Sequence, residues 1–143
     1  MSATVANPVA GLVAFLKADP IVGELTDGRV FGGELPEAQN MSMPRACVVL
    51  KPSGGGGQLG GGYQQFSDRR LDAYCYGPTP QNADELCTAV SVALKQLQRT
   101  IQAGTLIHWC RTASGAMSLR DSSTEWPYSL ASFQVLASEV AIA

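Results

Sequence analysis

An amphipathic helix placed directly after a strand constrains the fold of this 143-residue chain more than any other feature. Thr79 is a suitable N-cap, and Pro80 suits the first turn because that turn needs no N–H from it. Apolar residues then recur at helical spacing until about Gln98: Ala83, Leu86, Cys87, Val90, Leu94 and Leu97. Such a helix is roughly 28 Å long at the standard rise. It is long enough to cover a whole β-hairpin.

Two segments in front of this helix are predicted to form that hairpin. "RACVVLK" (residues 45–51) is apolar almost throughout, which indicates a strand buried on both faces. In "FSDRRLDAYCY" (residues 66–76), Leu71, Ala73 and Cys75 alternate onto one face. The second segment leads straight into the helix, so the helix covers the pair. One loop joins the two strands, and they should pair as a long antiparallel hairpin.

The remaining elements complete a single domain over residues 1–143. Asn7 followed by Pro8 predicts the start of a shorter helix that ends near Ala18, with one further turn after Pro20. Residues 105–111 and 128–140 are predicted strands. We therefore expect an α+β fold: an antiparallel β-sheet with a long glycine-tipped hairpin, covered by one long and one shorter α-helix.

The hairpin loop, "SGGGGQLGGGYQQ" (residues 53–65), contains seven glycines. A phosphate-binding loop would need a GK[ST] motif and a following helix, and neither occurs here. A domain linker is excluded because the helix needs strands from both sides of the loop. We therefore expect a mobile hairpin tip, with residues 54–62 disordered in the free subunit and ordered by a partner. The residues predicted to contact that partner are Gly54, Gly57, Leu59, Gly62, Tyr63 and Phe66 of the hairpin, together with Trp126.

The composition indicates a partly covered surface. Charged residues make up 15% of the chain, below the roughly 25% typical of soluble domains, so a neighbouring subunit is expected to cover part of the surface. The net charge is −2 without basic runs, which argues against a nucleic-acid grip. The apolar N-terminal stretch lacks a basic flank and is too short for a membrane span, so we expect neither a signal peptide nor an anchor.

No catalytic, metal or cofactor site is expected. The four cysteines form no CxxC pair, so zinc is not predicted. His108 and Cys110 alternate on one strand, but a nucleophile also needs a group that orients its base, and packing residues are the favoured interpretation. Trp109 is expected in the core beside Ile107. Trp126 lies in a turn-rich stretch and is equally compatible with capping the core and with contacting a partner.

The succession "ADPIVGELTDGRVFGGELPE", "MPRACVVL", a glycine-rich tip, "RRLDAYCYGPTPQNADELCTAVSVALKQL" and "SFQVLASEV" resembles the tail terminator, or tail completion, proteins of long-tailed bacteriophages. The resemblance covers most of the chain and rests on patterns rather than catalytic signatures. It implies a structural virion protein of the neck, assembled in the host cytoplasm.

In that family, an α+β subunit forms a hexameric ring that stops growth of the tail tube and joins it to the head-closing proteins. DNA passes through the lumen without specific binding. Two alternatives remain open. One is another neck ring protein, of the head-closure or adaptor type. The other is a small thiol hydrolase that uses Cys110 or Cys87 with His108.

Overall fold

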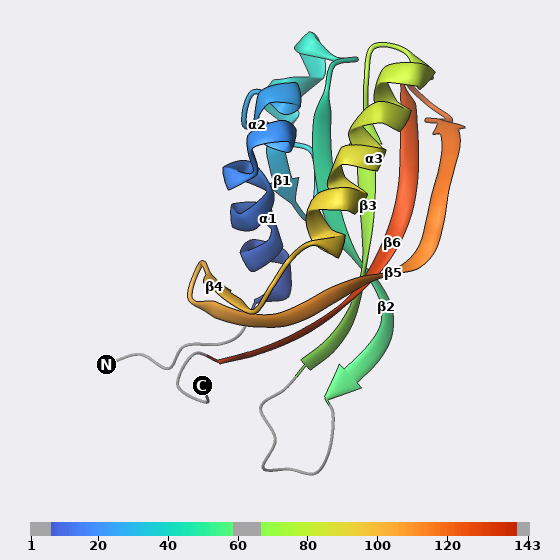
Figure 1. Ribbon diagram of the computed structural model, residues 1–143. Coiled ribbons are helices and arrows are strands. Elements are labelled where there is room, and N and C mark those ends of the chain that lie inside the picture. The colour runs from blue at the N-terminus through green and yellow to red at the C-terminus, as the bar shows by residue number, and fades with distance from the viewer. Residues whose placement is uncertain (1–6, 59–66, 140–143) are drawn as a thin grey trace.

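The computed structural model describes residues 7–58 and 67–139 (Figure 1). The helices are α1 (Pro8–Ala18), α2 (Pro20–Thr26) and α3 (Pro80–Lys95), with a 3₁₀ helix, η1 (Glu37–Ser42). The strands are β1 (Val30–Gly32), β2 (Cys47–Gln58), β3 (Ser67–Tyr76), β4 (Thr100–Gln102), β5 (Thr105–Arg120) and β6 (Pro127–Glu139).

Each α-helix begins where the sequence supplies a side-chain cap. Asn7 accepts a hydrogen bond from the Ala10 N–H at the start of α1, and Asp19 accepts two at the start of α2. Thr79 accepts from the Asn82 N–H at the start of α3. All three caps are followed by a proline in the first turn. The predicted helix starts are therefore confirmed.

The six strands form one mixed sheet in the order β1-β2-β3-β6-β5-β4. The expectation of a purely antiparallel sheet is wrong, because β1 pairs with β2 in parallel. The connection between them, residues 33–46, contains η1 and returns the chain to the end where β1 began. That return makes the pair parallel. The other four pairings, including the β2–β3 hairpin, are antiparallel.

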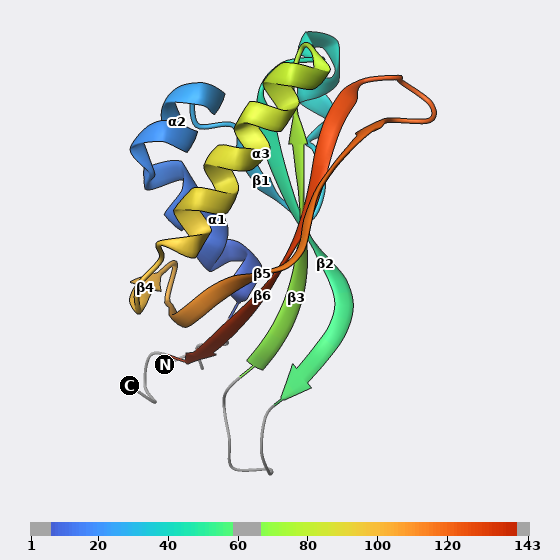
Figure 2. The ribbon, with the colours of Figure 1, turned by 45° about the vertical axis from the view of Figure 1, so that its right-hand side comes forward.

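The helices cover one face of this curved sheet, as Figures 1 and 2 show. Helix α3 packs on β3, β5 and β6, while α1 contacts β1, β2, β4 and β5. The core between the two layers contains the predicted apolar stripe, whose six members are all buried. Five of them lie on α3, and Leu97 follows it, because the helix ends at Lys95 and not near Gln98 as expected. Phe133 of β6 is the largest fully buried side chain. The long helix therefore covers β3 of the predicted hairpin together with β5 and β6, while α1 contacts β2, so the expected packing on the hairpin is confirmed for β3 alone.

A second, smaller core lies on the opposite face of the sheet, which we call the outer face. Cys47, Val49 and Tyr76 are buried there, partly under Leu35 and Met43 of the β1–β2 connection. Val48 and Leu50, which alternate with the first two, are buried in the main core. Residues 47–50 are therefore buried on both faces, as the sequence predicts.

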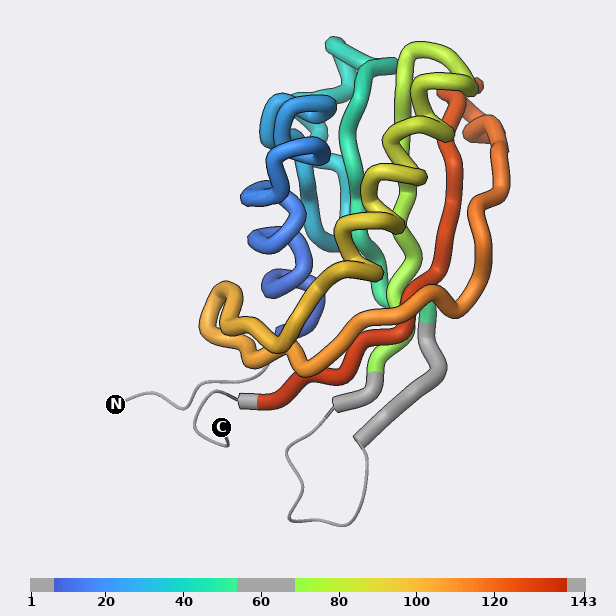
Figure 3. The backbone as a smooth tube through the Cα atoms, in the orientation of Figure 1, coloured from blue at the N-terminus to red at the C-terminus, as the bar shows by residue number. Residues whose placement is uncertain are grey.

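Strand β5 is long and strongly bent (Figures 1 and 3). Its pairing with β6 shifts register between Ile107 and Trp109, and twice more between Thr112 and Met117. The first shift breaks the alternation of the side chains, so Ile107 and Cys110 are both buried in the core. Trp109 is only half-buried, with the Arg111 guanidinium 4.1 Å from its ring centre. The expectation that Trp109 lies in the core is wrong for this reason.

The start of α1 is tied to β5 by two hydrogen bonds. The Asn7 N–H donates to Thr105 Oγ1 at 2.9 Å, and that hydroxyl donates to the Asn7 carbonyl at 3.3 Å. The two residues are 98 positions apart. Thr105 is fully buried, so these bonds hold the first helix against the far side of the sheet.

Candidate assembly surfaces

Four aromatic side chains gather on the outer face, and we call them the outer aromatic cluster: Tyr74, Tyr76, Trp126 and Tyr128. The ring centre of Tyr128 lies 5.7 Å from the ring centre of Tyr74 and 5.5 Å from that of Tyr76. Trp126 meets Tyr76 edge-on at 6.3 Å. Such ring pairs contribute roughly 0.5–1.5 kcal/mol each beyond the area that they bury. Tyrosine and tryptophan are also the side chains most enriched in protein interfaces.

The cluster is polar at its edge, and its buried environment affects the titration of Tyr74 and Tyr76. Lys51 Nζ lies 4.7 Å from the centre of the Tyr74 ring. Burial, with a smaller contribution from Asp121, raises the pKa of Tyr76 to about 12. Burial also raises the pKa of Tyr74. The phenols of Tyr74 and Tyr76 therefore keep their protons at neutral pH and can donate hydrogen bonds. A half-buried, amphipathic surface of this kind suits contact with another protein.

A short turn positions Trp126, the predicted contact residue that lies in the described part of the chain outside the hairpin. Asp121 Oδ1 accepts hydrogen bonds from the N–H groups of Ser123 and Thr124 and from the Ser123 hydroxyl. These bonds lower the pKa of Asp121 to about 2. The Asp121 N–H donates to the Trp126 carbonyl at 3.0 Å, which closes the turn. Trp126 is half-buried, so it both caps the outer core and keeps part of its ring exposed.

Two of the other predicted contact residues lie in β2, and the remaining four lie outside the described residues. Gly54 and Gly57 lie within β2, which extends through the glycines to Gln58. Gly57 pairs with Asp68 of β3. Leu59, Gly62, Tyr63 and Phe66 lie outside the described residues. The structure therefore places strand, rather than loop, over residues 53–58 of the expected tip.

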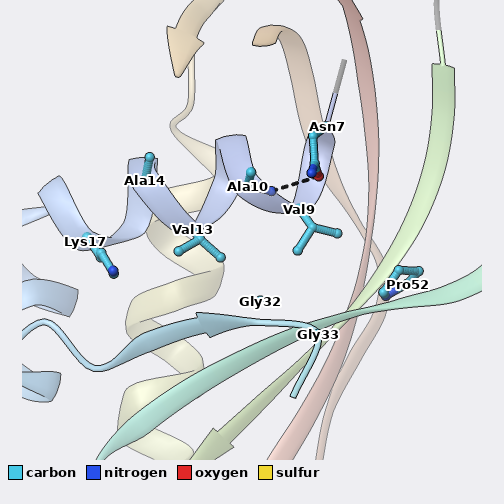
Figure 4. Close-up of a pocket in the computed structure, with 9 residues that line it drawn as sticks. All are labelled: Asn7, Val9, Ala10, Val13, Ala14, Lys17, Gly32, Gly33 and Pro52. Atoms are coloured by element: carbon cyan, nitrogen blue, oxygen red, sulfur yellow. Dashed lines mark hydrogen bonds between the residues drawn. The ribbon is translucent and has the colours of Figure 1, made fainter. Parts of the chain in front are cut away.

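A groove of about 560 Å³ opens between α1 and the β1–β2 side of the sheet (Figure 4). The residues that line it are Asn7, Val9, Ala10, Val13, Ala14, Lys17, Gly32, Gly33 and Pro52. Val9 and Val13 point into it from one turn of α1 to the next, while Lys17 and Pro52 stand at its two ends (Figure 4). A Cβ on Gly32 would come within 2.9 Å of Val9 Cγ1, so the helix approaches closely because residue 32 is glycine.

Sequence reasoning did not identify this groove. Val9 and Val13 are only partly buried, so part of each side chain faces the groove. The apolar lining can accept an apolar segment. Among the described residues, no carboxylate forms an ion pair with Lys17.

The residues of the thiol–imidazole alternative are placed for packing. Burial raises the pKa of Cys110 to about 12, so this thiol is protonated at neutral pH. Burial, followed by the charge of Arg99, lowers the pKa of His108, whose Nε2 lies 2.8 Å from Ser138 Oγ. A hydrogen bond from Cys75 lowers the pKa of Cys87, but the Cys87 side chain is fully buried. Both cysteines are buried.

Within the described residues, no group of three or more His, Cys, Asp and Glu side chains is arranged to hold a metal ion. None of the helices within residues 7–58 and 67–139 has the length and apolar character that a membrane span needs.

Comparison with known proteins gives a structural match. No family model and no curated protein matches the sequence. A solved structure titled "Virion of native gene transfer agent (GTA) particle" contains a chain that superposes with a TM-score of 0.67. The match covers 92% of this chain and 94% of that chain, at 14% sequence identity. The two chains share a fold. At this identity the likeness concerns the fold alone.

Proposed function

We propose that this chain is a structural virion protein of a phage-like particle, and that it forms the ring that caps the tail tube and joins it to the head-closing proteins of the neck. The observation that carries the proposal is the end-to-end match in fold to a chain of a gene transfer agent virion, which covers more than nine-tenths of both chains. The sequence resemblance to tail terminator proteins supports the finer assignment.

Several features of the surface suit a ring subunit. The outer aromatic cluster and the apolar groove lie on different sides of the fold, so one copy can contact neighbours in more than one direction. The charge-poor composition agrees with surfaces that subunits cover. The net charge of −2 also suits a lumen through which DNA slides, because each neutralised phosphate would add salt-sensitive affinity.

Native mass spectrometry tests this proposal. The protein is measured alone and after mixing with tail tubes assembled from the tube protein of the same genome. We expect six copies bound to the end of each tube, since the resemblance implies a six-fold tube and head-to-tail contacts close on rotation. Association only on the tube is an equally supportive result, because a ring subunit can remain monomeric until it meets its template.

Electron microscopy of the mixture supplies the matched control. Tubes that grow in the presence of the protein should end in a cap and have limited lengths, while tubes grown without it should continue to lengthen. Single, unassociated copies beside uncapped tubes would contradict the proposal. Binding to the head-closing protein but not to the tube would instead indicate another ring of the neck.

A further inference from the structure

The sheet has two edges on which backbone groups are left without a neighbouring strand in the described part of the chain. Strand β2 pairs with β1 only at residues 48–50, so its far side is open from residue 51 to Gln58. Strand β5 pairs with β4 only at residues 105–107, and among the described residues its far side has no neighbouring strand from Trp109 to Arg120. We call these the β2 edge and the β5 edge.

The two edges are open at the same level of the sheet. We call a set of residues that pair side by side across the four strands a row. The register connects residues across β2, β3, β6 and β5 in that order. One such row is Gly57, Asp68, Leu136 and Trp109, and another is Lys51, Asp72, Ser132 and Ser114. In every row between these two, the residue of β2 and the residue of β5 both lack a neighbouring strand on their outer side within the described part of the chain. A second copy placed beside the first by rotation, without a shift along the strands, brings one edge against the other.

The strand directions agree with such a contact. Strands β2 and β3, β3 and β6, and β6 and β5 are all antiparallel, so β5 runs opposite to β2. The β5 edge of one copy would consequently pair with the β2 edge of the next copy in the antiparallel sense. The open backbone of β5 is also accessible, since residues 111–118 are all exposed.

The side chains at both edges permit close approach. Residues 54–57 of β2 are glycines, and residues 112–116 of β5 are Thr, Ala, Ser, Gly and Ala. Natural edge strands are blunted by charged side chains, proline, β-bulges or a covering loop. Residues 109–114 contain no proline and one charged side chain, Arg111, whose guanidinium lies 4.1 Å from the centre of the Trp109 ring. On β2, Pro52 has no N–H to donate, so pairing along this edge should begin only after Pro52.

We propose that neighbouring copies join edge to edge, with residues 109–114 of one copy added to residues 53–57 of the next as an antiparallel strand. The inference rests on the proposed ring and names the contact that closes it. A second copy is the favoured occupant because the same chain supplies both edges in matching rows, which is the requirement for a head-to-tail contact that closes by rotation. Above this window β1 occupies the position beside β2. Each window contains one register shift, between Thr112 and Ser114 in β5 and between Pro52 and Gly56 in β2, so the new contact pairs two irregular strand segments.

Crosslinking on assembled material tests the contact. Ser53 and Ser114 are exposed, and Ser→Cys adds almost no volume at either position. The four native cysteines are buried. Tube-bound protein carrying Ser53→Cys and Ser114→Cys is treated with a short bismaleimide and separated on a denaturing gel. The expected result is a ladder of covalent oligomers up to the ring, at least about tenfold stronger than for the control pair Ser53→Cys and Ser122→Cys.

Ser122 is also exposed but lies in the turn after β5, away from the open rows. Equal crosslinking of both pairs in material that forms rings would overturn the edge contact and leave the proposed function standing. If the protein associates neither with itself nor with tubes, both proposals fail.

Amide hydrogen exchange on the unmodified protein gives a second measurement that needs no variant. Backbone hydrogen bonds across the new contact should slow exchange in residues 109–114 by at least about tenfold when the ring forms. Residues 105–107, which already pair with β4 on one side and β6 on the other, provide the internal reference and should not change. Unaltered exchange in residues 109–114 of an assembled ring would overturn the proposal.

Discussion

At the scale of single residues, the junction between β3 and α3 depends on a glycine. A Cβ on Gly77 would lie 2.6 Å from the Ala83 backbone nitrogen, which is closer than real Cβ atoms come to other heavy atoms. The neighbouring atom belongs to the helix backbone, so it cannot rotate away. Because glycine has no Cβ, the chain can pass this close to the helix, and β3 can lead directly into α3.

We expect Gly77→Ala to lower the free energy of unfolding by roughly 1–3 kcal/mol, because the added methyl forces backbone shifts. The matched control is Gly115→Ala, since nothing lies within 4 Å of a Cβ there. That variant should remain within about 0.5 kcal/mol of the unmodified protein. Urea unfolding measures both. Equal stability of the two variants would show that the junction relaxes without cost.

The turn that positions Trp126 should depend on pH. The pKa of Asp121 falls to about 2 in the folded protein, below its ordinary value, because its carboxylate accepts hydrogen bonds from residues 123 and 124. The stabilising contribution is therefore complete above the unfolded pKa of roughly 3.9 and is lost as the pH falls through about 2. The Trp126 fluorescence should change in this window.

The measurement uses a Trp109→Phe background, so that Trp126 is the remaining tryptophan. Asp121→Asn in the same background keeps the Oδ1 acceptor but does not titrate, and it should lack the transition. Other carboxylates contribute equally to both proteins. An identical acid response in the two would assign the transition to those other groups.

At the scale of elements, α3 is the part of the fold that the sequence predicts best. Its cap, its proline and its apolar stripe are local features, and each has the expected place in the structure. The direction of β1 could not be predicted in this way. It is three residues long, and its parallel pairing is set by a connection of irregular structure rather than by its own pattern.

The site was predicted only in part, for a related reason. Alternation places Tyr74 and Tyr76 on the face away from the core, and the structure agrees, but no local pattern shows that Tyr128 and Trp126 come to lie beside them. The position of Trp109 failed because a register shift in β5 has no signature in the residue types around it. Sequence periodicity reports which side chains can share a face, whereas pairing decides which of them meet.

The buried stripe of α3 should dominate the stability of the subunit. Leu94 is 1% exposed in the centre of the main core. Its replacement by Ala should lower the free energy of unfolding by roughly 2–5 kcal/mol through lost burial and the cavity left behind. Val92→Ala is the control on the same helix, because Val92 is 44% exposed. A loss below about 1 kcal/mol for Leu94→Ala, measured by urea unfolding, would mean that the surrounding core collapses onto the site.

At the scale of the whole molecule, the curved sheet separates two kinds of surface. The main core and the helices lie on one face, and the outer aromatic cluster lies on the other. The open edges lie at opposite ends of the same rows. The two faces of the sheet and its two edges thus point in different directions. A ring joined through its edges leaves the helix layer and the outer aromatic cluster free to meet other components.

The hydrogen bonds between Asn7 and Thr105 have a consequence for the order in which the protein is made. The first helix leaves the ribosome early, but the residue that secures its start is synthesised 98 positions later. At translation rates of about 5–20 residues per second, that delay is on the order of 5–20 s. During this time α1 lacks its anchor, and the apolar surface that it will cover is incomplete. A nascent chain that has not yet reached Thr105 therefore cannot form the bonds that secure its first helix.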